Sequence, residues 1–295
     1  MTKVYGDFDQ ETLDSEYLIS NTVPAIEPFL ADYARLSEEA RTLPGAREDI
    51  AYGDTPQEVM DIFPAGDNAP VFIFIHGGYW RMLSQKESAF MAPTMVPRGI
   101  AVVSVNYTLV GEGASIPEIV CQCRAAIAWI YKNARDFGGD PDRIFVGGSS
   151  AGGHLTGMMV AGGWHEEFGI PADTIKGAVP LSGLHDLEPV RLSCVNEWAK
   201  LDEAEARQNS PVHHLPDSGC PLIVTYGASE TNEFKRQSAL LANAWTAKGW
   251  LADLFEHPDR NHFDIVFDLG DPDSLLGRKV FAMIENTQKP NVFSE

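Results

Sequence analysis

The sequence predicts an α/β fold, with a mostly parallel, doubly wound sheet and helices on both faces. Short apolar runs alternate along the chain with segments of helical periodicity, and this order is typical of βαβ units. Several of the apolar runs lack polar alternation, as expected of strands that are covered on both faces. In such sheets ligands bind beyond the carboxyl ends of the strands, so the turns that follow strands are where chemistry is expected.

The amino-terminal segment, about residues 1–50, is predicted to form a helical cap ahead of the first strand. Within it, residues 17–41 form a polar segment with apolar side chains at helical spacings. These side chains are Ile26, Phe29, Leu30, Tyr33 and Leu36. The sequence contains no repeat and no Ser/Gly-rich linker, so we expect one domain over residues 1–295.

The predicted strands and the clearest helices follow this cap. The strands are VMDIF from Val59, VFIFIH from Val71, AVVSVNY from Ala101, IFVGGS from Ile144, GAVPLSG from Gly177, LIVTYG from Leu222 and LADLFEH from Leu251. One helix begins at a capping box formed by Ser115 and Glu118. Another runs from about Asn232 to Lys248 and ends at a glycine.

The composition limits which binding partners and which cellular compartment are expected. With 22 Lys and Arg against 42 Asp and Glu, the formal charge is −20, so nucleic acid and acidic membranes would be repelled. The chain starts without a signal-like apolar region and has no run near the roughly 20 residues that span a bilayer, so we expect a cytoplasmic protein. We interpret the few cysteines as reduced thiols, and expect neither a metal nor a cofactor. A homodimer is left open.

Ser150 is the predicted nucleophile. The strand IFV leads directly into Gly148-Ser149-Ser150-Ala151-Gly152 and then into a helical run. This matches Gly-x-Ser-x-Gly, in which the serine occupies a turn so tight that the residues two before and two after it must be small. Ser149 is the rival, but its second neighbour on the carboxyl side is Ala151, which has a Cβ. A phosphate-binding turn would need Gly-x-Gly-x-x-Gly at the first strand instead.

An oxyanion hole is predicted directly after the strand VFIFI, where the chain reads His76-Gly77-Gly78-Tyr79-Trp80. Glycines allow backbone N–H groups to turn toward a developing negative charge. The predicted donors are the N–H groups of Gly78 and Tyr79 and that of Ala151 after the nucleophile. We interpret His76 as a tether of this loop, and Tyr79 and Trp80 as candidates for the substrate pocket.

His262 is the predicted general base. Where Gly-x-Ser-x-Gly occurs, the triad follows the chain order serine, acid, histidine, so the base should lie in a loop after the last strand. The loop from Pro258 to Asp264 contains His262, whereas the rival His257 still lies at the end of the strand. Earlier histidines are more often structural or exposed; these are His165, His185, His213 and His214.

Glu230 is the predicted acid, because it lies in the turn after the strand LIVTYG. Glu233 falls in the first turn of the next helix, where the helix dipole favours an acidic residue in any case. Asp186, after GAVPLSG, is a further candidate. A carboxylate in this position holds the imidazole in the correct tautomer, and the imidazole in turn takes the proton of the serine.

These motifs together resemble one branch of a known family. HGGYW, GSSAGGHL, GASETNEFKRQS and NHFDIV occur in the order found in the kynurenine formamidase (arylformamidase) branch of the α/β-hydrolases, over roughly Tyr52 to Val266. In that branch the acid stands four residues before the phenylalanine of EF-x-RQS, which implies Glu230 before Phe234. The histidine of HFDI implies His262.

The resemblance implies a serine hydrolase that cleaves the amide bond of a small N-acyl arylamine, such as N-formylkynurenine or an N-acylanthranilate. One departure is visible, because the branch commonly has a histidine before the nucleophile and this chain has Ser149. That change bears on the substrate more than on the mechanism. A carboxylesterase for small aryl or alkyl esters is the alternative, and a non-catalytic binding protein on the same scaffold is a remote one.

Overall fold

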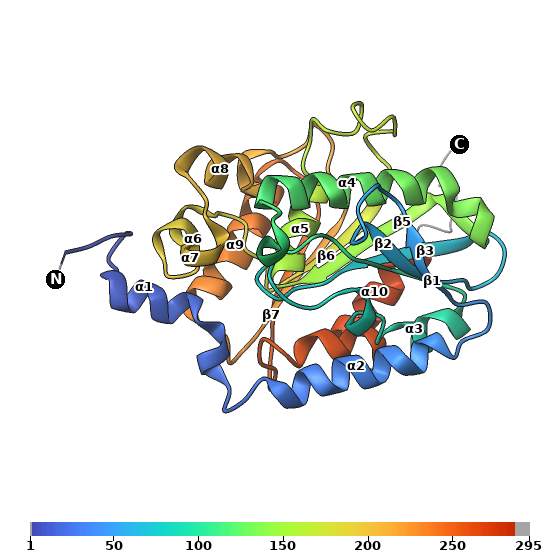
Figure 1. The fold of residues 1–295 in the computed structure, drawn as a ribbon, viewed down its shortest axis with the longest axis horizontal. Helices are drawn as coiled ribbons and strands as arrows, with labels where there is room; N and C mark the ends of the chain where they lie inside the picture. Colours follow the sequence, from blue (N-terminus) through green and yellow to red (C-terminus); the bar gives the residue numbers. More distant parts are fainter. Residues whose placement is uncertain (1, 287–295) are drawn as a thin grey trace.

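The computed structural model describes residues 2–286, which form one eight-stranded sheet flanked by helices (Figure 1). The strands are β1 (Arg47–Ala51), β2 (Val59–Phe63), β3 (Ala69–Ile75), β4 (Ala101–Val105), β5 (Gly139–Ser149), β6 (Ile175–Leu181), β7 (Leu222–Gly227) and β8 (Ala252–His257). Their order across the sheet is β1-β2-β4-β3-β5-β6-β7-β8. The strands from β3 to β8 run parallel, whereas β1 and β2 pair antiparallel with their neighbours. The predicted fold class is therefore confirmed.

Strand β1 was not predicted; it lies at the end of the segment, about residues 1–50, that was expected to form a helical cap. Its sequence REDIA is polar, and four of its five residues are exposed. As an edge strand that pairs only with β2, it buries little and so carries no apolar run to reveal it. The other strands overlap the predicted ones, although β5 begins at Gly139, five residues before the predicted start at Ile144.

Helices cover both faces of the sheet. The α-helices are α1 (Gln10–Tyr17), α2 (Glu27–Arg41), α3 (Ala92–Met95), α4 (Ile116–Asn133), α5 (Ala151–Val160), α6 (Glu188–Leu192), α7 (Asn196–Ala199), α8 (Glu203–Gln208), α9 (Asn232–Ala247) and α10 (Leu275–Asn286). Short 3-10 helices are η1 (Ile19–Thr22), η2 (Gln85–Glu87), η3 (Val96–Arg98), η4 (Val110–Glu112), η5 (Ala134–Phe137), η6 (Pro211–His213) and η7 (Ile265–Gly270). The predicted capping box begins α4, with Ser115 as its N-cap.

The core is divided by the sheet into two apolar layers. Alternate side chains of β3 point to opposite faces, so Val71 and Ile73 join one layer, and Phe72 and Phe74 join the other. Helices α4, α5 and α9 pack in the first layer, and α2, α3 and α10 in the second (Figure 1). No helix within residues 2–286 combines the length and the apolarity that crossing a membrane requires.

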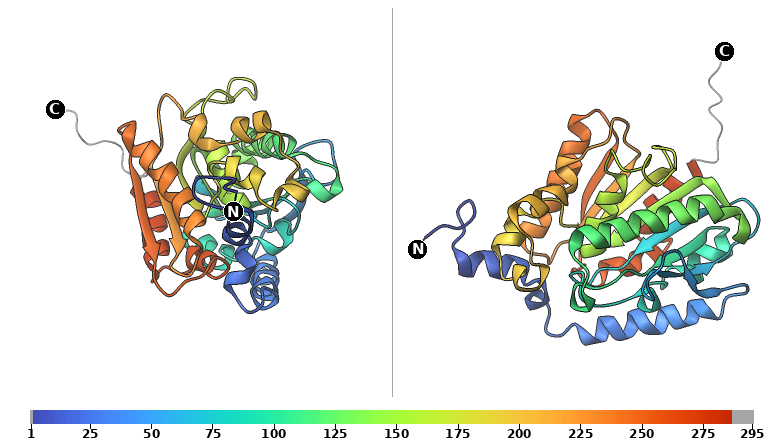
Figure 2. Two further views of the ribbon diagram at one scale, coloured as in Figure 1. Left: turned by 90° about the vertical axis from the view of Figure 1, so that its left-hand side faces the viewer. Right: turned by 45° about the horizontal axis from the view of Figure 1, so that its top comes forward.

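Only the first part of the amino-terminal segment lies near the carboxyl ends of the strands (Figure 2). Helix α1 lies beside α6, and α2 runs along the outside of the second layer (Figure 2). Tyrosine hydroxyls bind this segment to two loops of the body. Tyr33 donates to the carbonyl of Phe263, and Tyr79 donates to the carbonyl of Tyr17. The segment therefore contributes one wall of whatever site lies at this edge of the sheet.

Candidate active site

Ser150 occupies the sharp turn between β5 and α5. Its backbone has φ 60° and ψ −119°, a conformation that costs an L-residue on the order of 1–3 kcal/mol. The glycines two residues away are required by close backbone contacts. A Cβ on Gly148 would lie 2.4 Å from the carbonyl oxygen of Gly152, and one on Gly152 would lie 2.0 Å from that of Ile75. This geometry explains the Gly-x-Ser-x-Gly spacing around Ser150.

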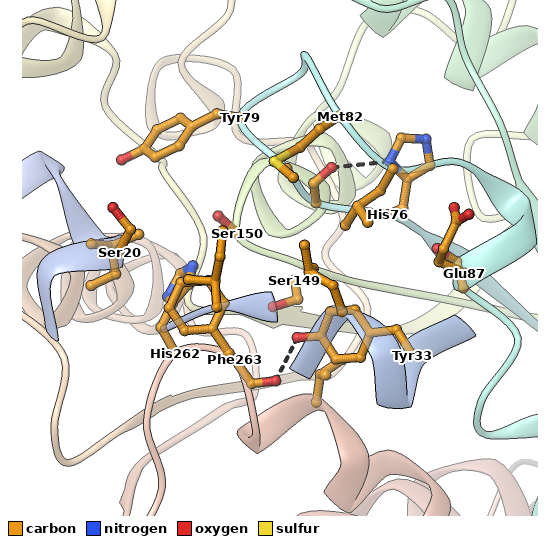
Figure 3. Close-up of a pocket in the computed structure, with 18 of the residues that line it drawn as sticks. Ser20, Tyr33, His76, Tyr79, Met82, Glu87, Ser149, Ser150, His262 and Phe263 are labelled. Atoms are coloured by element: carbon orange, nitrogen blue, oxygen red, sulfur yellow. Dashed lines mark hydrogen bonds between the residues drawn. The ribbon is translucent and has the colours of Figure 1, made fainter. Parts of the chain in front are cut away.

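Glu230 and His262, which are distant in sequence, form a hydrogen-bonded pair near this serine. The His262 Nδ1–H donates to Glu230 Oε2 at 2.9 Å, and both side chains are buried. In a neutral imidazole this bond favours the tautomer with its proton on Nδ1, whose Nε2 can accept a proton. Ser150 and His262 line the same pocket, and Figure 3 draws them next to each other. The structure therefore brings together all three residues that the sequence predicted for the triad.

The second oxygen of Glu230 is also held, by groups that the sequence analysis did not identify. The hydroxyl of Ser182 donates to Glu230 Oε1 at 2.6 Å, and the N–H of Gly227 donates to the same oxygen at 2.7 Å. Ser182 follows β6 and has φ 46°, unusual for a serine. The sequence offers no signal for Ser182, because its contact with Glu230 depends on β6 and β7 being neighbours in the sheet.

The two rival acids have other partners. Glu233 pairs with Arg236 at 2.7 Å and accepts a hydrogen bond from the hydroxyl of Tyr17 at 2.8 Å. Asp186 accepts from the N–H of Glu188 and from the hydroxyl of Tyr5. Neither carboxylate has a hydrogen bond to a histidine among the described residues, so the geometry favours Glu230.

The rival base His257 faces away from the pocket. Its Nε2 lies 2.8 Å from Asp268 Oδ2, and the same aspartate binds Arg260 through both oxygens. His257 does not line the pocket that holds Ser150. It therefore belongs to a charged cluster at the end of β8.

Two other histidines are structural supports. Nδ1 of His76 lies 3.0 Å from the carbonyl oxygen of Gly77, and its ring stacks on Tyr107 at 4.1 Å. His154, in α5, lies with its Nε2 2.7 Å from the carbonyl oxygen of Asn209. Burial lowers the pKa of both imidazoles to about 4, so both are neutral near pH 7. His76 has the position of the loop tether predicted for it.

The loop after β3, which is predicted to supply oxyanion donors, contains three successive residues with positive φ. Gly78, Tyr79 and Trp80 have φ of 92°, 52° and 59°, which turns successive backbone N–H groups away from ordinary pairing. Within residues 2–286, no hydrogen bond uses the N–H of Gly78 or Tyr79. Ala151 begins α5, so its N–H is one of the first-turn donors that a helix leaves unsatisfied. All three predicted donors are therefore free to bind an anion.

Trp80 does not line the pocket, which corrects its place among the pocket candidates. Its side chain is fully buried, and its Nε1–H donates to Nδ1 of His154 at 3.2 Å. Tyr79, the other candidate, does line the pocket. The two rings meet edge-on, with centroids 6.0 Å apart, and only that of Tyr79 belongs to the wall of the pocket.

The pocket in front of Ser150 has a cavity volume of about 160 Å³ and is mostly apolar (Figure 3). Its apolar wall consists of Leu18, Ile19, Ile26, Leu30, Tyr33, Phe74, Tyr79, Met82, Leu83, Phe90, Trp198, Phe263 and Val266. Several of these belong to the amino-terminal segment, which therefore forms part of the site. Ser149 also lines the pocket, but it is a residue of β5, and the turn itself is at Ser150. No three His, Cys, Asp or Glu side chains of residues 2–286 are grouped to hold a metal ion.

Comparison with known proteins points to hydrolases. The family model described as BD-FAE matches residues 60–245. The kynurenine formamidase of Danio rerio is 30% identical over 256 residues, which cover 84% of this chain and 85% of that protein. The kynurenine formamidase of Salmo salar is 31% identical over 257 residues, with the same coverage. Esterase LipQ of Mycobacterium tuberculosis is 32% identical over 247 residues, covering 75% of this chain and 57% of that protein.

Solved structures share the fold. A protein of Silicibacter sp. TM1040 with a provisional thioesterase assignment has a TM-score of 0.79 and 29% identity, covering 92% of this chain and 98% of that one. An esterase of Pyrobaculum calidifontis has a TM-score of 0.69 and 19% identity, covering 95% of this chain and 94% of that one. The second likeness extends to the fold alone.

Proposed function

The chain belongs to the BD-FAE family of α/β-hydrolases and is related to the kynurenine formamidases, and from that premise we propose that it hydrolyses the amide bond of a small N-acyl arylamine. The observation that carries the proposal is the Glu230–His262 hydrogen bond beside Ser150, in an apolar pocket. The partner of this protein is then a small aromatic molecule.

The proposed reaction passes through an acyl-enzyme. Nε2 of His262 accepts the proton of Ser150 as its Oγ attacks the carbonyl carbon, and Glu230 stabilises the imidazolium that forms. The carbonyl oxygen becomes an oxyanion that the N–H groups of Gly78, Tyr79 and Ala151 bind. The imidazolium then protonates the leaving arylamine. Water, activated by the same imidazole, releases the acid and restores the serine.

The lining of the pocket supports an aromatic substrate. Tyr79, Trp198 and Phe263 present rings to the cavity, and rings of this kind bind a flat arylamine by stacking and edge contacts. A cavity of about 160 Å³ has room for a single small ring and a short acyl group.

A carboxylesterase for small esters is the second candidate, because esterase LipQ is similar to this chain and esters use the same residues. The two functions differ in the leaving group. An amine must be protonated before it leaves, whereas an alcohol or phenol leaves more easily. Activity on esters alone therefore requires less of His262 as an acid.

A matched panel of substrates tests the proposal. N-formyl, N-acetyl and N-butanoyl derivatives of one arylamine are compared with the esters of the corresponding phenol, by kcat/KM. Hydrolysis of at least one amide by wild type, lost in Ser150→Ala, supports the proposal. Hydrolysis of the esters with no amide turnover would replace it with the carboxylesterase.

A further inference from the structure

Arg81 is a cation on the wall of the pocket that has no carboxylate partner within residues 2–286. Other arginines form salt bridges, with a nitrogen–oxygen distance within 4 Å, to carboxylates. Examples are Arg236 with Glu233 and Arg260 with Asp268. Arg81 has none, although the chain carries 42 acidic residues against 22 basic ones. Its side chain is exposed and lines the cavity in front of Ser150, so it lies at the solvent end of that cavity.

Packing holds the guanidinium of Arg81 in place. Its Cζ lies 3.8 Å from the centre of the Trp198 ring, and Trp198 packs edge-on against Tyr79 with ring centroids 5.8 Å apart. The N–H of Arg81 donates to the carbonyl of Gly78 at 3.0 Å. The cation is therefore fixed to the loop that supplies the oxyanion donors. Stacking uses the face of the guanidinium and leaves its N–H groups free.

A negative charge lies at another place on the wall of the pocket. Glu87 also lines the pocket, and its Oε2 accepts hydrogen bonds from the N–H and the hydroxyl of Ser84. A substrate carboxylate would be repelled near Glu87, and burying it in the apolar lining without a partner would be costly. Arg81 offers such a group both a solvated position and two parallel N–H donors.

We propose that Arg81 is a specificity residue that binds a carboxylate on the aryl part of the substrate. This rests on the proposed function and adds to it that the preferred arylamine is an anion, such as an acylated aminobenzoate. The acyl carbonyl lies at Ser150, and the ring lies against the aromatic wall that Tyr79 and Trp198 form together. The carboxylate then meets Arg81 at the exposed end of the pocket.

The expected effect of losing this cation is on substrate binding. Hydrogen bonds to charged groups are worth enough to change affinity by about tenfold or more. Arg81→Gln should therefore raise KM about tenfold or more for N-formyl-2-aminobenzoate, with kcat within about threefold. Formanilide, which lacks the carboxylate, should keep its KM within about twofold. Arg81→Lys should fall between, because an ammonium keeps the charge but loses the bidentate geometry.

The test compares these two amides, and a matched ester pair of 2-carboxyphenyl acetate and phenyl acetate, in wild type, Arg81→Gln and Arg98→Gln. Arg98 is the control, since it also lies over an aromatic ring, that of Phe281, but outside this pocket. A rise in KM confined to the carboxylated members and to Arg81→Gln supports the proposal. Equal losses on both members of a pair, or none, would overturn it.

The ester pair and a binding measurement separate this proposal from the proposed function. If wild type cleaves the esters and neither amide, the amidase proposal fails, yet the ester pair still reports on Arg81. Calorimetric titration with 2-aminobenzoate and with aniline needs no turnover. Tighter binding of 2-aminobenzoate by wild type, lost in Arg81→Gln and retained in Arg98→Gln, supports the carboxylate contact. Equal binding of the two compounds by wild type would contradict it.

Discussion

The indole Nε1–H of Trp80 donates to Nδ1 of His154 at 3.2 Å, which joins the loop after β3 to the helix that follows the nucleophile. The rings meet edge to face, with centroids 5.2 Å apart. Since Nε2 of His154 lies 2.7 Å from the carbonyl oxygen of Asn209, its Nδ1 is free to accept this bond. Two of the proposed oxyanion donors lie just before Trp80 and the third lies at the start of α5. One buried hydrogen bond therefore fixes their relative positions.

Replacing Trp80 by Phe should lower kcat about tenfold or more, with little change in KM. The phenyl ring fills much of the same space but cannot bind His154, so the loop loses its link to α5. Oxyanion donors act mainly in the transition state, and misplacing one affects kcat. Steady-state kinetics on the best substrate of the panel measures both constants.

Trp245→Phe is the matched control for that prediction. Trp245 is also buried, and its Nε1–H donates to the carbonyl of Cys220 at 2.9 Å, far from the pocket. Both variants should lose stability on the order of 1–3 kcal/mol, measured by urea unfolding. Only Trp80→Phe should lose kcat. A similar loss of kcat in both would mean that reduced stability, and not the oxyanion loop, explains the effect.

Glu230→Gln should slow turnover about 10²- to 10⁴-fold, which is less than the loss in Ser150→Ala. The amide can present its N–H to His262 and so favour the wrong tautomer, while the nucleophile and the base remain. Glu233→Gln serves as the comparison, because that carboxylate binds Arg236 and Tyr17 instead. Full activity of Glu230→Gln together with loss in Glu233→Gln would transfer the role of the acid.

A serine-directed fluorophosphonate should label Ser150 and not Ser149. Ser150 lies in the turn, whereas Ser149 is still the last residue of β5. Peptide mass spectrometry after labelling identifies the modified residue, and Ser150→Ala should lose the label while remaining folded. Labelling that persists in Ser150→Ala and disappears in Ser149→Ala would show that the turn assignment is wrong.

The sequence was sufficient to predict the parts of this fold that short motifs and hydrophobic patterns specify. Gly148 is required by a close contact with the backbone of Gly152 in the same turn, and Gly152 by one with Ile75 at the end of β3. The apolar strands reflect burial on both faces of the sheet. The order of serine, acid and histidine along the chain, combined with the predicted strands, then led to Glu230 and His262. Strand β1 was missed because an exposed edge needs no apolar residues.

Contacts that reach the site from distant parts of the chain could not be predicted from local sequence patterns. Ser182 reaches Glu230 from a neighbouring strand, and that contact depends on strand order, which one sequence does not reveal. Trp80 was assigned to the pocket because its motif lies beside the oxyanion hole, yet its ring is fully buried and donates to His154. Side-chain direction in an irregular loop follows no helical or strand periodicity, so the sequence pattern did not reveal it.

Tyr33→Phe should lower kcat by about three- to tenfold while leaving the protein folded. The hydroxyl of Tyr33 donates to the carbonyl of Phe263, the residue after the proposed base, and its ring packs against Phe90. Removing the hydroxyl preserves that packing but loosens the loop that holds His262. The control is Tyr52→Phe, which loses a similar bond to the carbonyl of Asn106 outside the pocket. Unchanged kcat in Tyr33→Phe would show that the amino-terminal segment does not position the base.

The last prediction concerns pH, and it begins with the histidines that do not titrate near neutrality. Burial lowers the pKa of His76 and His154 to about 4 and that of His185 to about 3. These three imidazoles stay neutral in the folded protein above about pH 5. The base must be neutral in the free enzyme to accept the proton of Ser150, so kcat/KM should fall on the acid side of neutrality with one proton.

Stability has to be separated from that fall in rate. In the unfolded chain the same three histidines titrate near an ordinary pKa of about 6.5. Between about pH 6.5 and 4 the unfolded state therefore binds more protons than the folded state, and the free energy of unfolding decreases as the pH falls. We call the fall of kcat/KM on the acid side the acid limb. If activity returns in full when samples are brought back to pH 7, and the circular dichroism spectrum is unchanged at each pH, the acid limb reflects protonation of the folded enzyme.

Two variants then test which histidine is protonated in the acid limb. His257→Ala should keep the limb, because His257 lies beside Asp268 and outside the pocket. His262→Ala should lose most of the activity and, in the turnover that remains, the limb as well, since water then attacks or Ser150 reacts without an imidazole base. A limb that persists in His262→Ala and disappears in His257→Ala would assign the base to the histidine at the end of β8, and the Glu230–His262 hydrogen bond would then be structural.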